Sequence, residues 1–102
     1  MNPAISQKLG ELAVLCSRYR VRRLELFGSG TGERFDPEKS DLDFLVEFHP
    51  LNPGEHADAY FGLKESLRKL FGHPVDIVMT RAIRNPYFLQ GIEHSRVLLY
   101  AA

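Results

Sequence analysis

The sequence has only one cysteine, Cys16, among its 102 residues, and this scarcity excludes two classes of small protein. A disulfide framework needs at least two cysteines in the chain, and a cysteine-rich zinc site also needs several. Cys16 lies among Leu12, Leu15 and Tyr19. We therefore interpret it as a small buried apolar residue rather than as a reactive thiol.

Net charge and long apolar runs are also lacking. Lys and Arg together number 13, and Asp and Glu together number 13, so the formal net charge is zero. A chain with this balance does not coat nucleic acid through bulk electrostatics, although a local basic patch is compatible with it. No apolar run approaches the roughly 20 residues that span a bilayer, and the first residues do not resemble a signal peptide. We expect a cytoplasmic protein with no membrane partner.

What is present is the composition of an ordinary globular protein, with a length that predicts one domain over residues 1–102. Asn-Pro pairs at Asn2, Asn52 and Asn85 each suit a helix start, since Asn caps free N–H groups and Pro needs no donor there. Apolar residues at spacings of three and four then predict helices over about 3–19 and 53–71, with a shorter one over about 86–94. Glu55 follows Asn52 by three residues, as in a capping box, and Gly72 is a stop signal.

Strand patterns occupy the segments between these helices. We predict strands over about 24–27, 41–48, 75–79 and 97–100. The clearest is the second, in which four apolar residues alternate on one face: Leu42, Phe44, Val46 and Phe48. The order of elements predicts an α/β or α+β domain, with one small mixed sheet flanked by helices.

Two carboxylates share the other face of that clearest strand. Asp41 and Asp43 are two residues apart, so the period of a strand puts both opposite Leu42 and Phe44. Side by side they repel each other unless a cation lies between them, and hard oxygen ligands suit Mg²⁺. The alternative is a pair of solvated acids at the start of a strand, although aspartate is disfavoured in strands.

A third carboxylate, Asp76, lies within the apolar run Pro74–Met79, which we interpret as an interior strand. An acid there is costly unless it is paired or binds a cation. The alternative to metal binding is an ion pair with Arg81 or Arg84. If the strands of Asp43 and Asp76 are neighbours, three carboxylates converge, which is enough for one or two magnesium ions.

Glycines follow the first predicted strand directly, in the run Gly28-Ser29-Gly30-Thr31-Gly32. Such a loop can expose backbone N–H groups to a phosphate, and the alternative is an ordinary flexible loop. It is not a P-loop, because Glu33-Arg34 stands where Lys and Ser or Thr are needed. It is not a Rossmann fingerprint either, because no apolar helical pattern follows.

A basic cluster precedes the first strand. It contains Arg18, Arg20, Arg22 and Arg23. An acidic partner or RNA could use it, but a solvated face is the interpretation that the neutral total favours.

Taken together, these motifs resemble those of the minimal nucleotidyltransferase family, within the DNA polymerase β-like superfamily. Leu-Phe-Gly-Ser at 26–29, Ser-Asp-Leu-Asp at 40–43 and Val-Asp-Ile-Val at 75–78 carry the resemblance, which covers nearly the whole chain. One departure is that Gly32-Glu33 stands where the family usually has Arg-Gly, with Arg34 close by.

The resemblance implies a magnesium-dependent nucleotidyltransferase fold and activity. Gly28, Ser29 and Gly30 would bind the nucleotide phosphates, and Asp41 and Asp43 would bind both metals. Asp76 would bind the catalytic metal and help to deprotonate a hydroxyl acceptor. The nucleotide would be ATP, with AMP transferred and pyrophosphate released.

The resemblance also implies a partner, because members of this family often act as antitoxins. They pair with a small helical toxin of the HEPN type, and some transfer AMP to a toxin tyrosine. The alternative within the same fold is an antitoxin that neutralises its partner by contact alone, which the altered Gly32-Glu33 pair favours. A third reading is an unrelated α/β domain whose acids are structural.

Overall fold

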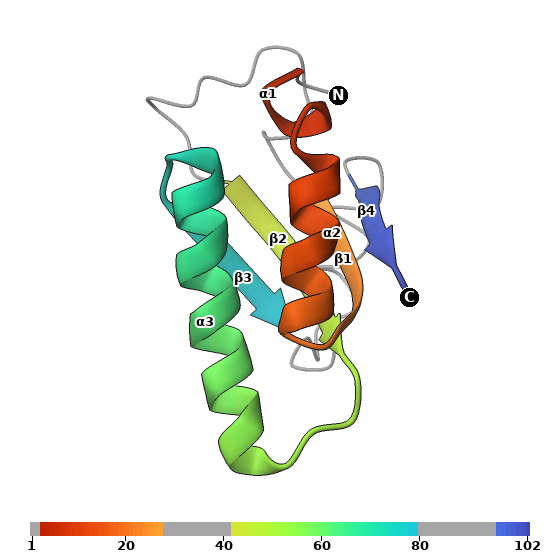
Figure 1. Ribbon diagram of the computed structural model, residues 1–102, viewed down its shortest axis with the longest axis vertical. Helices are drawn as coiled ribbons and strands as arrows, with labels where there is room; N and C mark the ends of the chain where they lie inside the picture. The colour runs from red at the N-terminus through yellow and green to blue at the C-terminus, as the bar shows by residue number, and fades with distance from the viewer. Residues whose placement is uncertain (1–2, 28–41, 80–95) are drawn as a thin grey trace.

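The computed structural model describes residues 3–27, 42–79 and 96–102 (Figure 1). The predicted helix over 86–94 lies outside these residues. The described elements are α1 Pro3–Ser6, α2 Leu9–Arg18, β1 Val21–Phe27, β2 Leu42–Phe48, α3 Pro53–Phe71, β3 Val75–Met79 and β4 Val97–Ala101. None of the helices in this part of the chain combines the length and apolar character needed to cross a membrane.

The four described strands form one mixed sheet in the order β3-β2-β1-β4. Strand β1 pairs antiparallel with β2 on one side and with β4 on the other, while β2 and β3 are parallel. Parallel neighbours need a long crossover between them, and helix α3 provides it. The predicted class, a small mixed sheet with helices packed on it, is confirmed.

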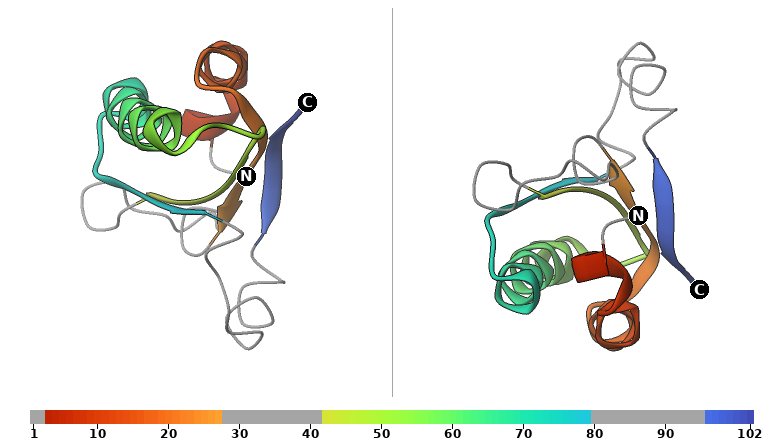
Figure 2. Two further views of the ribbon diagram at one scale, coloured as in Figure 1. Left: turned by 90° about the horizontal axis from the view of Figure 1, so that it is seen from below. Right: turned by 90° about the horizontal axis from the view of Figure 1, so that it is seen from above.

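Helices α2 and α3 lie side by side on one face of the sheet, which we call the covered face (Figure 2). The apolar residues predicted to alternate along β2 point to this face, and all four are buried. They join the buried residues of the helices in one core cluster. Period-two alternation in β2 therefore builds this core on one side, while the other side carries Asp43 and Glu47 together with the buried Leu45.

The first predicted helix is interrupted. Residues 3–19 form α1 and α2 separated by a turn at Gln7 and Lys8 rather than one helix, which corrects the prediction. Lys8 has φ −108° and ψ 10°, and its ammonium group donates to the carbonyl of Leu70 at 2.6 Å. A cation at the end of α3 complements the helix dipole there, and the turn keeps Ile5 buried in the core.

Helix α3 begins and ends at the predicted residues. Asn52 is the N-cap and Pro53 the first helical residue, but the Asn52 side chain caps no backbone N–H. It donates instead to the Glu55 carboxylate at 3.0 Å, so the predicted capping box is wrong in its detail. At the other end Gly72 adopts φ 70°, the left-handed conformation that favours glycine after a helix.

The two long helices approach each other closely at Gly62. A Cβ added there would lie 2.5 Å from Cε1 of Tyr19, so only glycine fits without movement of the ring. The Tyr19 hydroxyl is hydrogen-bonded to the Ser66 hydroxyl at 3.0 Å, which holds the ring in place. Nearby Cys16 is fully buried, and burial raises the pKa of its thiol to about 12, which confirms its reading as an apolar core residue.

Candidate active site

Asp43 and Asp76 lie directly beside each other on neighbouring strands. They are register partners in the parallel pair β2 and β3. The flanking residues Phe44 and Ile77 are buried in the core, so both aspartates point to the opposite face, which we call the open face. Neighbouring strands are about 4.8 Å apart, so the two side chains leave the sheet as adjacent groups.

The setting of Asp76 differs from the prediction. Strand β3 is the outermost of the four described strands on its side, not an interior strand, and the side chain of Asp76 is exposed. The apolar residues of this strand face the helices, since Val75 and Ile77 are buried. A carboxylate in water is not costly by itself, so burial is not what makes this residue informative. Asp76 is informative because it is the register partner of Asp43.

The donor chemistry of this pair fits a hard divalent cation. Two carboxylates on adjacent strands repel each other and offer oxygen ligands to Mg²⁺. No group of three or more potential metal-ligating side chains occurs within residues 3–27, 42–79 and 96–102. Asp41, the third predicted ligand, lies outside the described residues, as do Arg81 and Arg84, the alternative partners of Asp76.

The predicted phosphate loop also falls outside the described residues. Gly28, Ser29 and Gly30 follow β1 directly in the chain, and Asp41 directly precedes β2. Phe27, the last residue of β1, is the register partner of Asp43. The described strands therefore bring the last residue before the glycine run level with both Asp43 and Asp76.

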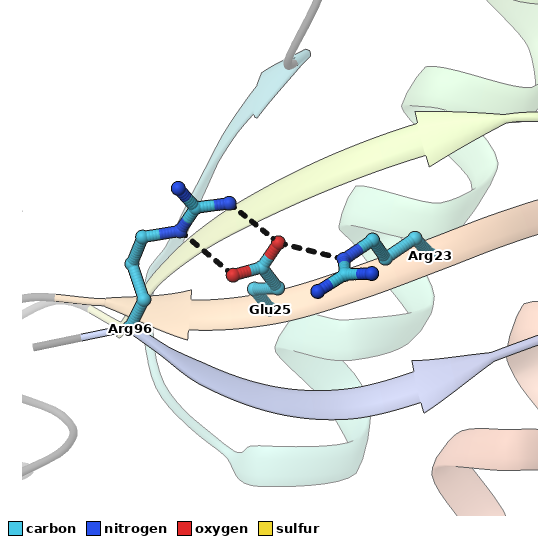
Figure 3. A network of polar contacts seen from close by, with 3 residues as sticks. All are labelled: Arg23, Glu25 and Arg96. Carbon is cyan, nitrogen blue, oxygen red and sulfur yellow. Dashed lines mark hydrogen bonds and ion pairs between the residues drawn. The ribbon is translucent and has the colours of Figure 1, made fainter. Parts of the chain in front are cut away.

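A second group of charges occupies the open face, and sequence reasoning did not single it out. The Glu25 side chain is only 7% exposed, and both of its oxygens accept hydrogen bonds from arginines (Figure 3). Arg96 donates through Nε and Nη2 at 2.8 Å each, and Arg23 donates through Nε at 2.9 Å. The hydrogen bond from Arg96 is the main cause that lowers the pKa of Glu25; Arg23 adds to it, while burial opposes it.

A signal for this group was present in the sequence. Glu25 stands in the run Leu24–Phe27, where an acid among apolar residues requires a partner if its side chain is buried. What the sequence could not supply is the identity of that partner, because Arg96 lies 71 residues further along the chain.

The predicted basic cluster extends from the end of α2 into β1, and three of its four arginines are paired within the chain. Arg20 contacts Glu55 at 3.3 Å, and Arg22 contacts Glu47 at 3.4 Å. Both arginine side chains are about half exposed, so the solvated reading holds for them. Arg23 differs, because it takes part in the buried Glu25 network.

The chain belongs to the nucleotidyltransferase domain family, whose family model matches residues 12–99. One relative is "Putative protein adenylyltransferase MJ1379" of Methanocaldococcus jannaschii, 36% identical over 85 residues. That match covers 82% of each chain. The predicted family is therefore confirmed.

Solved structures with the same fold place the chain among the minimal members of this family. One is described as a putative minimal nucleotidyltransferase, with a TM-score of 0.71, 29% identity and coverage of 95% of each chain. Another is a tri-AMPylated Shewanella oneidensis HEPN toxin in complex with an MNT antitoxin. Its TM-score is 0.63 at 19% identity, with coverage of 95% of this chain and 72% of that one, so it supports the fold alone.

Proposed function

We propose that this protein is a magnesium-dependent nucleotidyltransferase that transfers AMP from ATP to a hydroxyl group of a partner protein. The single observation that supports this most strongly is the register pairing of Asp43 with Asp76 on the open face. Family membership supports the reaction type, and two adjacent carboxylates supply the ligands that a magnesium–nucleotide complex needs.

Each predicted site residue has a role in this proposal. Asp41, Asp43 and Asp76 would hold the metal, and Gly28, Ser29 and Gly30 would bind the phosphates; these roles follow from the resemblance of the motifs. When bound, magnesium neutralises phosphate charge and favours loss of the proton from the attacking hydroxyl.

The transfer itself forms one bond and breaks one. The acceptor oxygen attacks the α-phosphorus, the bond from that phosphorus to the α,β-bridging oxygen breaks, and pyrophosphate leaves. The proton of the acceptor hydroxyl passes to a carboxylate of the site, for which Asp76 is our candidate. Its exposure suits this role, because an acceptor held by another molecule must reach it from solvent.

The acceptor that we favour is a tyrosine of a helical HEPN-type toxin. The support is indirect: a structural neighbour is an MNT antitoxin bound to a tri-AMPylated HEPN toxin, and a relative carries the name of a protein adenylyltransferase. Transfer of AMP would add a bulky anionic group to that partner and so change its activity.

Titration calorimetry with ATP, with and without magnesium, tests the nucleotide part of this proposal. Wild type should bind ATP only with magnesium, and the Asp43→Asn, Asp76→Asn double variant should lose that binding while it stays folded. Asp58→Asn is a matched control, since it removes an exposed acid from α3. Loss of binding in the control, or retention in the double variant, would contradict the metal roles.

A second candidate is an antitoxin that acts by contact without chemistry, which Gly32-Glu33 in place of the family's Arg-Gly favours. Incubation with labelled ATP and a purified helical toxin separates the two. The enzyme reading predicts label on the toxin that disappears in the Asp43→Asn, Asp76→Asn variant. The contact reading predicts an unlabelled toxin that is neutralised equally by wild type and variant.

A further inference from the structure

The open face carries a positive group close to its acidic pair. Glu25 is opposite Leu45 in the pairing of β1 with β2, and Asp43 lies two residues before Leu45. Glu25 and Asp43 are therefore diagonal neighbours on the same face, with backbones about 7–8 Å apart. The Glu25 network thus begins close to the Asp43 carboxylate, and Asp76 lies one strand further away.

Arg96 is level with the acidic pair along the strand direction, two strands away from Asp43 and three from Asp76. Val97 pairs with Leu26, so the same register continued by one residue brings Arg96 level with Phe27. Phe27 is level with Asp43, and Asp43 is level with Asp76. Figure 3 shows the Arg96 side chain extending from the start of β4 over β1, on the side of the sheet away from α3.

The three side chains of the Glu25 network are together positively charged. One carboxylate faces two guanidinium groups, so the three side chains carry a net charge of +1. On the same face of the sheet, Asp43 on β2 and Asp76 on β3 carry two negative charges. A surface with a cation-binding pair beside a fixed positive charge matches a magnesium–polyphosphate complex, which presents a metal ion and phosphate oxygens together.

The geometry also fixes Arg96. Two parallel hydrogen bonds from a planar guanidinium to one carboxylate define its position and plane, because the fork of donors matches the two oxygens. The carboxylate is almost fully buried, whereas 28% of the Arg96 side chain is exposed, so the network is anchored at Glu25 and accessible at Arg96. A charge held in place in advance loses little freedom when an anion binds.

We propose that Arg96 is a phosphate-binding residue of the nucleotide site and that Glu25 is the positioning residue that holds its guanidinium there. The inference rests on the proposed nucleotidyltransferase function and adds a positive group to it. It assigns Arg96 to the polyphosphate part of the nucleotide rather than to the base, because the non-bridging phosphate oxygens are hydrogen-bond acceptors that share negative charge, whereas the base is neutral.

Binding of ATP, AMP and adenosine, measured in the presence of magnesium, tests this assignment. Arg96→Gln should weaken ATP binding by at least about tenfold, weaken AMP less and leave adenosine unchanged. Arg96→Lys should recover part of the ATP affinity, because it restores charge without the fork. Arg22→Gln is the matched control: it removes an arginine from an exposed pair with Glu47, and ATP affinity should not change.

The double variant Glu25→Gln, Arg96→Gln separates positioning from simple stability. It removes the buried carboxylate together with its main partner, so thermal stability should return toward the wild-type value relative to Arg96→Gln alone. ATP affinity should stay at the level of Arg96→Gln. The single variant Glu25→Gln should also weaken ATP binding, because Arg96 keeps its charge but loses its anchor.

Three results would overturn the inference. If folded Arg96→Gln bound ATP as tightly as wild type, Arg96 would not contact the phosphates. If the double variant recovered ATP affinity together with stability, the Glu25–Arg96 pair would have a structural role only. No binding of magnesium–ATP by folded wild type would overturn the proposed function, and this inference with it. The first two results leave the proposed function in place, so the two failures are distinguishable.

Discussion

The two faces of the sheet have different roles, although the same strands build both: the covered face stabilises the fold, and the open face carries the charged residues of the candidate site. On the covered face Leu42, Phe44 and Val46 are at most 1% exposed and pack against α2 and α3. On the open face of the same strands, Asp43 lies beside Asp76, and Glu25 accepts hydrogen bonds from Arg96. Because side chains alternate along a strand, adjacent residues can serve stability and chemistry separately.

The largest expected effect is a loss of stability after a substitution in the core on the covered face. Phe44 is fully buried, and its ring stacks on Phe71 with centroids 6.0 Å apart. Phe44→Ala should lower the free energy of unfolding by about 3–5 kcal/mol, because it opens a cavity in the core. Urea denaturation measures this change.

Asp43→Asn, one residue away on the open face, is the counterpart of Phe44→Ala. It should change the free energy of unfolding by less than about 1 kcal/mol while it abolishes magnesium-dependent ATP binding. If it destabilised the domain as much as Phe44→Ala, the proposed division between the faces would be wrong.

A smaller effect is expected at the buried charge of the open face. Glu25→Gln should lower the free energy of unfolding at pH 7 by about 1–3 kcal/mol, because it removes charged hydrogen bonds. The folded-state pKa of Glu25 is lowered from its ordinary value of 4.5, so its stabilisation is fully present above that pH. It is lost as the pH falls below 4.5 through the lowered pKa.

The measurement is urea denaturation of wild type and Glu25→Gln at several pH values. The difference between them should shrink below pH 4.5. Glu47→Gln serves as the control, since its pair with Arg22 is exposed and contributes at most about 1 kcal/mol. A difference that does not depend on pH would show that the charge of Glu25 is not what stabilises the fold.

Two helical glycines, one packed against Tyr19 and one exposed, should respond to substitution with opposite signs. Gly62→Ala places a methyl group against Tyr19, and overpacking of about 1–3 kcal/mol exceeds the gain in helix propensity of about 1 kcal/mol. Gly10→Ala meets nothing within 4 Å, so it should stabilise the protein by up to about 1 kcal/mol. Thermal unfolding of both variants decides it, and a stabilising Gly62→Ala would show that the Tyr19 ring moves freely.

The smallest effect is expected at Cys16. Burial raises the pKa of the Cys16 thiol to about 12, so little of the reactive thiolate forms at pH 8, and the side chain is fully buried. A thiol reagent should therefore leave the folded protein unmodified and label it in urea. Rapid labelling of the folded protein would show that the covered face opens locally.

Much of the fold was predictable because its signals are local. Helix α3 and the alternation of β2 follow from apolar periodicity within single segments, and the structure confirms both. The turn at Lys8 was missed because it depends on Leu70, which is remote in the chain. Strand β3 was misplaced as interior because an apolar run looks the same at the edge of a sheet when helices cover one face.

For the candidate site too, local features were predictable from the sequence and contacts between remote residues were not. The spacing of Asp41, Asp43 and Asp76 made them candidates, and the register of β2 with β3 places Asp43 beside Asp76. The roles of Asp41, Gly28, Ser29 and Gly30 stay predictions. The link from Glu25 to Arg96 was not predictable, because no local pattern tells one distant arginine from another as the partner of a buried acid.

Strand β4 is the last of the described strands to be synthesised, so the residues of the proposed site are not all available to a nascent chain at the same time. A nascent chain that has been translated through Met79 already holds the sequence for β1, β2 and β3, and so for the acidic pair. Arg96 is synthesised later, and Glu25 lacks its main hydrogen-bond partner until then. Until β4 has joined the sheet, a partly folded chain holds the acidic pair without Arg96, so we expect it to bind metal ions better than nucleotides.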